Sequence, residues 1–115
     1  TFKNIVFVEP MSYLSFMYLI KNCLAVITDS GGISEETTVL GIPCFTLRKN
    51  TERPEKEAIG TNTLVGISVE KLITAYQSFR LYGKRKSSIP ELWDGKSSER
   101  IIAVLLTVFN PSELK

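Results

Sequence analysis

Short apolar runs alternate with helix-like segments along this chain. Four short runs have strand character, and the first of them is apolar on both faces, as a parallel sheet requires. Between and after them, apolar residues recur at the three- and four-residue intervals of an amphipathic helix. The predicted strands cover residues 4–9, 24–28, 42–47 and 63–66, and the predicted helices cover residues 12–22, 33–40, 68–82 and 97–109, with a further helix start at Pro54.

This alternation predicts an α/β fold. Strands that are separated by helices favour a parallel sheet with right-handed crossovers and helices on both faces. The length of 115 residues and the 43% share of hydrophobic residues suit one globular domain. The final predicted helix has a wide apolar face, which we expect to cover this sheet or a neighbouring structure.

The junction between the second predicted strand and the following helix is the first candidate site. Ser30, Gly31 and Gly32 lie there, after Asp29. Ligands of open parallel sheets bind at the carboxyl ends of strands, glycines with positive φ let a ligand approach the backbone, and a helix start attracts phosphate. The same residues also suit a plain connection in which Asp29 or Ser30 caps the helix. Taken alone, the motif leaves both interpretations open.

Three other side chains could each bind a ligand or have a purely structural role. Phe16, near a strand end, could stack on a nucleobase or fill the interface between a helix and the sheet. Arg53 lies in a charged segment past the third predicted strand and could bind a phosphate or form local ion pairs. Glu36 lies in the first turns of its helix, where a carboxylate complements the helix dipole.

Composition limits which partners and which catalytic groups can be expected. A net charge of +2 gives no reason to expect nucleic acid binding. No apolar run reaches the roughly 20 residues of a membrane span and no signal peptide begins the chain, so we expect a cytoplasmic protein. The chain has no histidine, the commonest general base near neutral pH, and its two cysteines are expected to be reduced core thiols. We therefore expect neither a metal nor a cofactor.

Several motifs at matching spacing resemble one enzyme family, the non-hydrolysing UDP-N-acetylglucosamine 2-epimerases. The most specific are the segment DSGGISEE at residues 29–36 and the segment TERPE at residues 51–55. Shorter matches lie at residues 40–43, Arg48, residues 60–62, residues 64–66 and residues 93–96. The resemblance runs through most of the chain and is to the carboxyl-terminal half of these enzymes.

The resemblance implies a Rossmann-like domain, part of the carboxyl-terminal half of a B-type glycosyltransferase-like (GT-B) fold. Family members interconvert UDP-GlcNAc and UDP-ManNAc by eliminating UDP and adding it back with C2 inverted. By the same resemblance, the full-length protein would be a homodimer. The residues that it implies for binding the UDP-sugar are Ser30, Gly31 and Gly32 at the diphosphate, Glu36 at the ribose hydroxyls, Phe16 at the uracil, and Arg53 at the phosphate region.

The same resemblance implies that the acid and base groups lie elsewhere. In the family, the catalytic carboxylates and histidine belong to the amino-terminal portion. We therefore expect residues 1–115 to be a UDP-binding domain fragment with no catalytic residue, inactive by itself. The alternatives are a noncatalytic nucleotide-binding or assembly module, and a part of a hydrolysing 2-epimerase or a glycosyltransferase.

Overall fold

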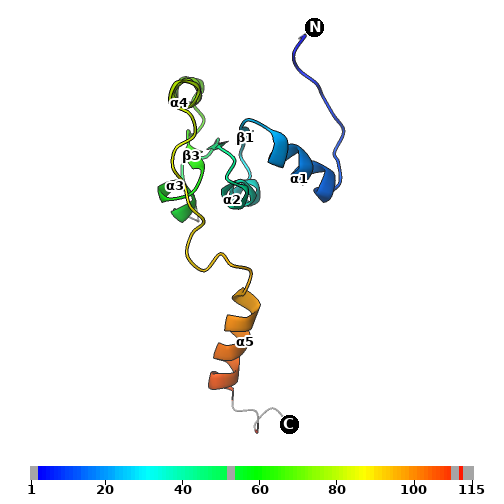
Figure 1. Ribbon diagram of the computed structural model, residues 1–115, viewed down its shortest axis with the longest axis vertical. Coiled ribbons are helices and arrows are strands. Elements are labelled where there is room, and N and C mark those ends of the chain that lie inside the picture. The colour runs from blue at the N-terminus through cyan, green and yellow to red at the C-terminus, as the bar shows by residue number, and fades with distance from the viewer. Residues whose placement is uncertain (1–2, 52–53, 110–111, 113–115) are drawn as a thin grey trace.

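The computed structural model describes residues 3–51, 54–109 and 112 (Figure 1). Most predicted elements are present, although the strands are shorter than expected. In chain order the elements are α1 (Tyr13–Asn22), β1 (Val26–Thr28), α2 (Gly31–Leu40), β2 (Cys44–Thr46), α3 (Glu55–Ala58), β3 (Asn62–Leu64), α4 (Val69–Tyr82) and α5 (Ser97–Val108).

The three strands form one parallel sheet in the order β1-β2-β3. Their register aligns Thr28 with Thr46 and Thr46 with Leu64, so the carboxyl ends of all three strands lie at one edge. The predicted parallel α/β fold is therefore confirmed, and the segments that follow β1 and β2 leave the sheet on the same side. A cross-strand hydrogen bond from the Thr46 hydroxyl to Asn62 Oδ1 joins β2 and β3 below that edge.

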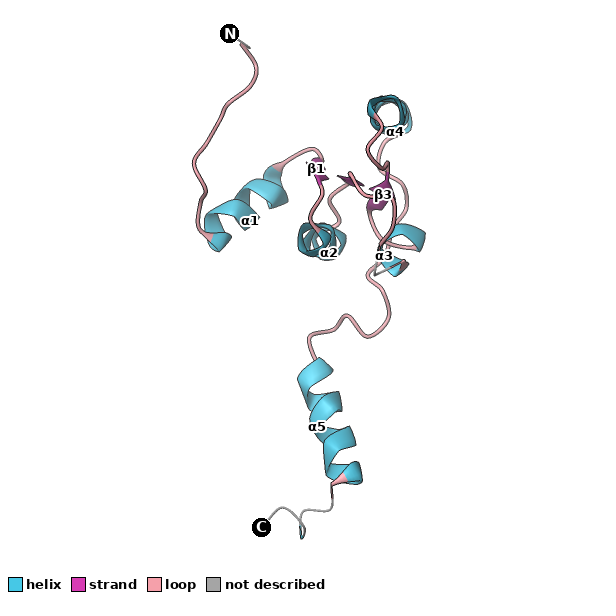
Figure 2. Cartoon of the chain, turned by 180° about the vertical axis from the view of Figure 1, so that it is seen from behind, coloured by secondary structure: helices cyan, strands magenta, loops and turns pink. Residues whose placement is uncertain are grey.

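Helices cover both faces of the sheet (Figure 2). Phe45 of β2 is buried against α4, where its ring makes edge contacts with Tyr76 and Phe79 at centroid distances of 6.4 and 6.2 Å. Because side chains alternate along a strand, the neighbouring Cys44 points to the opposite face, which α2 covers. This packing places the start of α2 beside the carboxyl edge of the sheet.

The prediction of a first strand at residues 4–9 is wrong. This segment has no strand structure, and its apolar side chains are exposed, with Val6 at 83% and Phe7 at 88%. An apolar run predicts burial in a sheet, but a strand also needs a neighbour for its N–H and C=O groups. The segment runs away from the three strands (Figure 1), and no described strand pairs with it.

The described part of the chain is elongated. It measures 67 × 31 × 23 Å with a radius of gyration of 18.5 Å, whereas a compact domain of this length would have about 13 Å. Helix α5 projects away from the sheet, so the apolar face predicted for it is exposed, as Ile101 at 58% and Leu105 at 47% illustrate. None of the helices in the described ranges is long and apolar enough to cross a bilayer.

Candidate functional site

Helix α2 begins at the predicted corner with a side-chain cap. The Ile33 N–H donates to Ser30 Oγ at 3.3 Å, and the Ser30 N–H donates to Thr28 Oγ1 at 3.0 Å. Ser30 is thus the N-cap that the plain interpretation predicts. Its hydroxyl uses a lone pair for this bond and keeps a proton that it can donate to an anion. Capping and anion binding are therefore compatible at Ser30.

The two glycines are helical, which corrects the expected positive φ. Gly31 and Gly32 are the first two residues of α2, and neither has a left-handed backbone. Their N–H groups precede any intrahelical acceptor and lie at the positive end of the helix dipole. A Cβ on the exposed Gly32 would lie 3.9 Å from Ser30 Oγ, in otherwise open space. The lack of a side chain leaves this helix end accessible.

Arg48 brings a cation to the same corner. It follows β2 at the carboxyl edge of the sheet, and its Nη1 lies 3.4 Å from the position that a Cβ on Gly31 would occupy. The family resemblance includes Arg48 among its motifs but implies no role for it. Parallel pairing of β1 with β2 explains its position, because the segments after both strands leave the sheet at the same edge.

Glu36 is joined to α1 through Tyr13. The Tyr13 hydroxyl donates to Glu36 Oε1 at 2.7 Å. This hydrogen bond to Glu36 is the main cause that raises the pKa of Tyr13 above its ordinary value, and the carboxylate charge adds to the shift. A carboxylate has about four acceptor positions, so Glu36 can hold Tyr13 and still accept hydrogen bonds from a vicinal diol. The sequence carried no signal that linked Tyr13 to Glu36, which lies 23 residues away.

Phe16 lies near this pair. It is three residues after Tyr13 on α1, so the two side chains project from neighbouring positions on one helix face. Phe16 is 38% exposed, which leaves part of its ring accessible to a ligand. Stacking on a base stays a prediction. Arg53, the sixth residue of the predicted site, lies outside the described residues.

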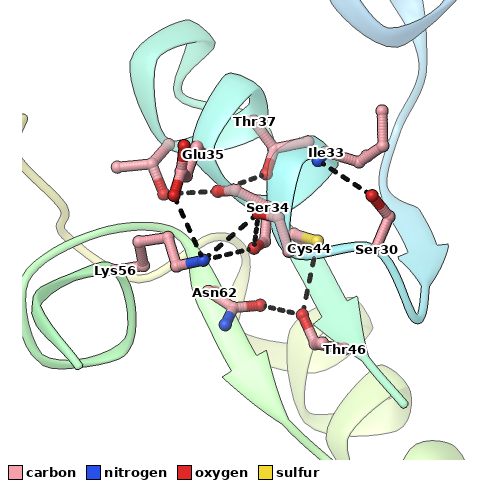
Figure 3. A network of polar contacts seen from close by, with 11 residues as sticks. Ser30, Ile33, Ser34, Glu35, Thr37, Cys44, Thr46, Lys56 and Asn62 are labelled. Atoms are coloured by element: carbon pink, nitrogen blue, oxygen red, sulfur yellow. Dashed lines mark hydrogen bonds and ion pairs between the residues drawn. The ribbon is translucent and has the colours of Figure 1, made fainter. Parts of the chain in front are cut away.

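Lys56 is a further cation at the corner, and it is buried. It belongs to α3, directly after the TERPE segment, and its ammonium group lies beneath the first turn of α2 (Figure 3). It donates to Ser34 Oγ at 2.8 Å and to the Gly31 carbonyl at 3.2 Å. No signal in the sequence indicates that Lys56 is buried, because the charged segment before it was equally consistent with a solvated turn that forms local ion pairs.

The assembled corner suits an anionic ligand that carries hydroxyl groups. The start of α2, the Arg48 guanidinium and the Lys56 ammonium bring positive charge to it, and Glu35 lies 4.0 Å from that ammonium. Glu36 adds an acceptor one turn further along the helix. A phosphate beside a ribose has this combination of charge and hydroxyl donors. The arrangement is one for holding a ligand.

Comparisons with known proteins show what this chain is similar to. A family model described as UDP-N-acetylglucosamine 2-epimerase matches residues 1–106. The chain is 46% identical over 103 residues to the UDP-N-acetylglucosamine 2-epimerase of Methanocaldococcus jannaschii, covering 90% of this chain and 28% of that enzyme. The chain therefore spans between a quarter and a third of the length of this relative.

Solved structures extend the likeness to three dimensions. The Methanocaldococcus jannaschii enzyme in complex with UDP-GlcNAc and UDP matches with a TM-score of 0.75 at 48% identity, over 87% of this chain and 27% of that one. The Neisseria meningitidis UDP-GlcNAc 2-epimerase bound to UDP-GlcNAc matches with a TM-score of 0.77 at 36% identity, over 87% and 28%. The predicted GT-B-like fold class is confirmed by these neighbours.

Proposed function

The chain belongs to the UDP-N-acetylglucosamine 2-epimerase family, and from this premise we propose that it binds UDP within an enzyme that interconverts UDP-GlcNAc and UDP-ManNAc. Residues 1–115 would form a UDP-binding, Rossmann-like part of its carboxyl-terminal domain. The observation that carries the proposal is the capped, side-chain-free start of α2 at the carboxyl edge of the sheet. Solved relatives bound to UDP-GlcNAc support the same ligand.

The corner would bind the diphosphate. The N–H groups of Gly31 and Gly32 and the hydroxyl of Ser30 are donors, and Arg53 would add a guanidinium contact from the TERPE segment. Charge-assisted bonds of this kind are worth roughly 1.5–3 kcal/mol each. Since UDP is the leaving group of the proposed reaction, these residues would stabilise it when its bond to the sugar breaks.

The uridine would lie between α1 and α2. Glu36 would accept hydrogen bonds from the ribose hydroxyls, while Phe16 would pack against the uracil. The bond from Tyr13 to Glu36 supports this assignment, because it holds the carboxylate toward α1.

By the family resemblance, proton transfer at C2 would come from residues outside these 115. The family resemblance also leads us to propose a cytoplasmic homodimer for the full-length protein. Sedimentation of the full-length protein would measure whether it is a dimer.

Turnover of UDP-GlcNAc by the full-length protein in D₂O tests the proposed function. We expect NMR to show UDP-ManNAc with deuterium at C2, because inversion there requires exchange of that hydrogen. Free ManNAc and UDP as products would indicate a hydrolysing enzyme instead, and UDP binding without turnover would indicate a noncatalytic module. Turnover by the isolated 115-residue chain would contradict the proposal that proton transfer resides elsewhere.

Replacing Tyr13 with phenylalanine is expected to weaken UDP binding about fivefold. The substitution removes the hydroxyl that holds Glu36 and keeps the ring, and a hydrogen bond contributes about 1 kcal/mol. Isothermal titration of full-length protein with UDP measures the change. Tyr18→Phe on the same helix is the matched control, because Tyr18 is 69% exposed. Equal affinities of the two variants would remove Tyr13 from the site.

A further inference from the structure

Lys56 is a buried cation in a position that the proposed ligand contacts do not explain. Its side chain is only 3% exposed. It extends from the short helix α3 to the underside of the first turn of α2 (Figure 3). Its partners there, Ser34 and Gly31, lie 22 and 25 residues before it in the sequence. Lysine is among the residues least often buried without a specific partner.

The partners of Lys56 belong to the residues that shape the corner. Nζ donates to Ser34 Oγ at 2.8 Å and to the Gly31 carbonyl at 3.2 Å. Ser34 Oγ donates in turn to the same Gly31 carbonyl at 2.7 Å. The carbonyl of Gly31 therefore accepts from two side-chain donors, which fixes the peptide plane at the start of α2 and, with it, the direction of the Gly32 N–H group.

The positive charge of Lys56 is expected to destabilise α2. A helix start is positive, and cations there oppose the helix dipole. Burial of the ammonium adds a desolvation cost. Glu35 lies 4.0 Å from Nζ, but its side chain is 42% exposed, so solvent screens its attraction. An anion bound at the start of α2 would offset both costs.

We propose that Lys56 is a positioning residue for the diphosphate of UDP, an inference that rests on the proposed function of this corner. It holds the Gly31 carbonyl from beneath, and its charge adds to the positive potential that the ligand meets at the start of α2. Lys56 itself lies on the far side of this turn and acts through Gly31 and Ser34.

A purely structural clamp makes a different prediction. If Lys56 only held α2 in place, its loss would weaken every ligand of the site alike. If its charge acts on the phosphates, the loss must grow with the charge of the ligand, from uridine through UMP to UDP. This gradient separates the two roles without requiring catalysis.

The test is titration of Lys56→Met in the full-length protein with UDP, UMP and uridine. We expect the Kd for UDP to rise about tenfold, the Kd for UMP to rise less, and the Kd for uridine to stay within twofold. Lys21→Met is the matched control, because it removes the same charge from an exposed position in the last turn of α1. It should leave all three values unchanged.

A second variant provides the same test if Lys56→Met does not fold. Lys56→Met with Ser34→Ala removes donor and acceptor together, which leaves no buried hydroxyl without its partner. An unchanged affinity for UDP, or an equal loss for UDP and uridine, in either folded variant would overturn the role of Lys56. Failure of the unaltered protein to bind UDP would instead overturn the proposed function, and this inference with it.

Discussion

Replacing Gly32 with valine in the full-length protein is expected to raise the Kd for UDP at least about thirtyfold while leaving the fold intact. A Cα–Cβ bond in a helix tilts toward the amino terminus, so a side chain at the second residue of α2 projects into the space beyond the helix start. That space is where the phosphate would accept its hydrogen bonds. Loss of one or two such charge-assisted bonds corresponds to this change, at roughly 1.5–3 kcal/mol each.

The fold should tolerate this change because the position is open. Gly32 is exposed, and within 4 Å its added Cβ would meet Ser30 Oγ alone, at 3.9 Å. Helix propensity slightly favours valine over glycine. Gly32→Ala gives an intermediate point, with a smaller side chain in the same direction. Full UDP affinity in the valine variant, measured by titration together with its melting temperature, would show that the ligand does not approach this helix end.

The pattern of apolar residues predicted the sheet because it reports burial and spacing. Three of four predicted strands pair in parallel, and α2 follows β1 with the predicted short connection. Residues 4–9 show what an apolar pattern does not report. Their side chains have the character of a buried strand, but pairing depends on a neighbour that no local pattern specifies.

The site could be predicted where its residues are close in sequence. Ser30, Gly31 and Gly32 form one local turn, so their joint position follows from the strand and helix on either side. Tyr13 and Lys56 reach the same corner from 23 and 25 residues away from their partners Glu36 and Gly31. Such contacts depend on how α1 and α3 pack, which composition and periodicity leave open.

The reason expected for the glycines at positions 31 and 32 differs from the one that the structure shows. Backbone freedom was expected at Gly31 and Gly32, yet both have ordinary helical conformation. What they contribute is space, beside Arg48 for Gly31 and toward solvent for Gly32. Sequence identifies a glycine in a turn but does not distinguish a need for positive φ from a need for room.

The largest loss of stability is expected from Gly60→Ala, a change outside the binding corner. An added Cβ at Gly60 would lie 2.5 Å from the Lys56 carbonyl oxygen and 2.8 Å from Thr38 Cγ2. Gly60 is buried, and one of these neighbours is backbone, so α3 or α2 must shift. Overpacking of this kind costs about 1–3 kcal/mol, which thermal unfolding of the full-length protein measures as a lower melting temperature.

Gly32→Ala is the matched control for Gly60→Ala, since both add one methyl group to a glycine that lacks positive φ. At Gly32 the methyl group enters open space at the helix start, so UDP affinity should fall and the melting temperature should hold. At Gly60 it enters the packed junction between Lys56 and Thr38, so the melting temperature should fall first. Equal melting temperatures for the two variants would contradict the close packing of α2 against α3, and with it the buried position of Lys56.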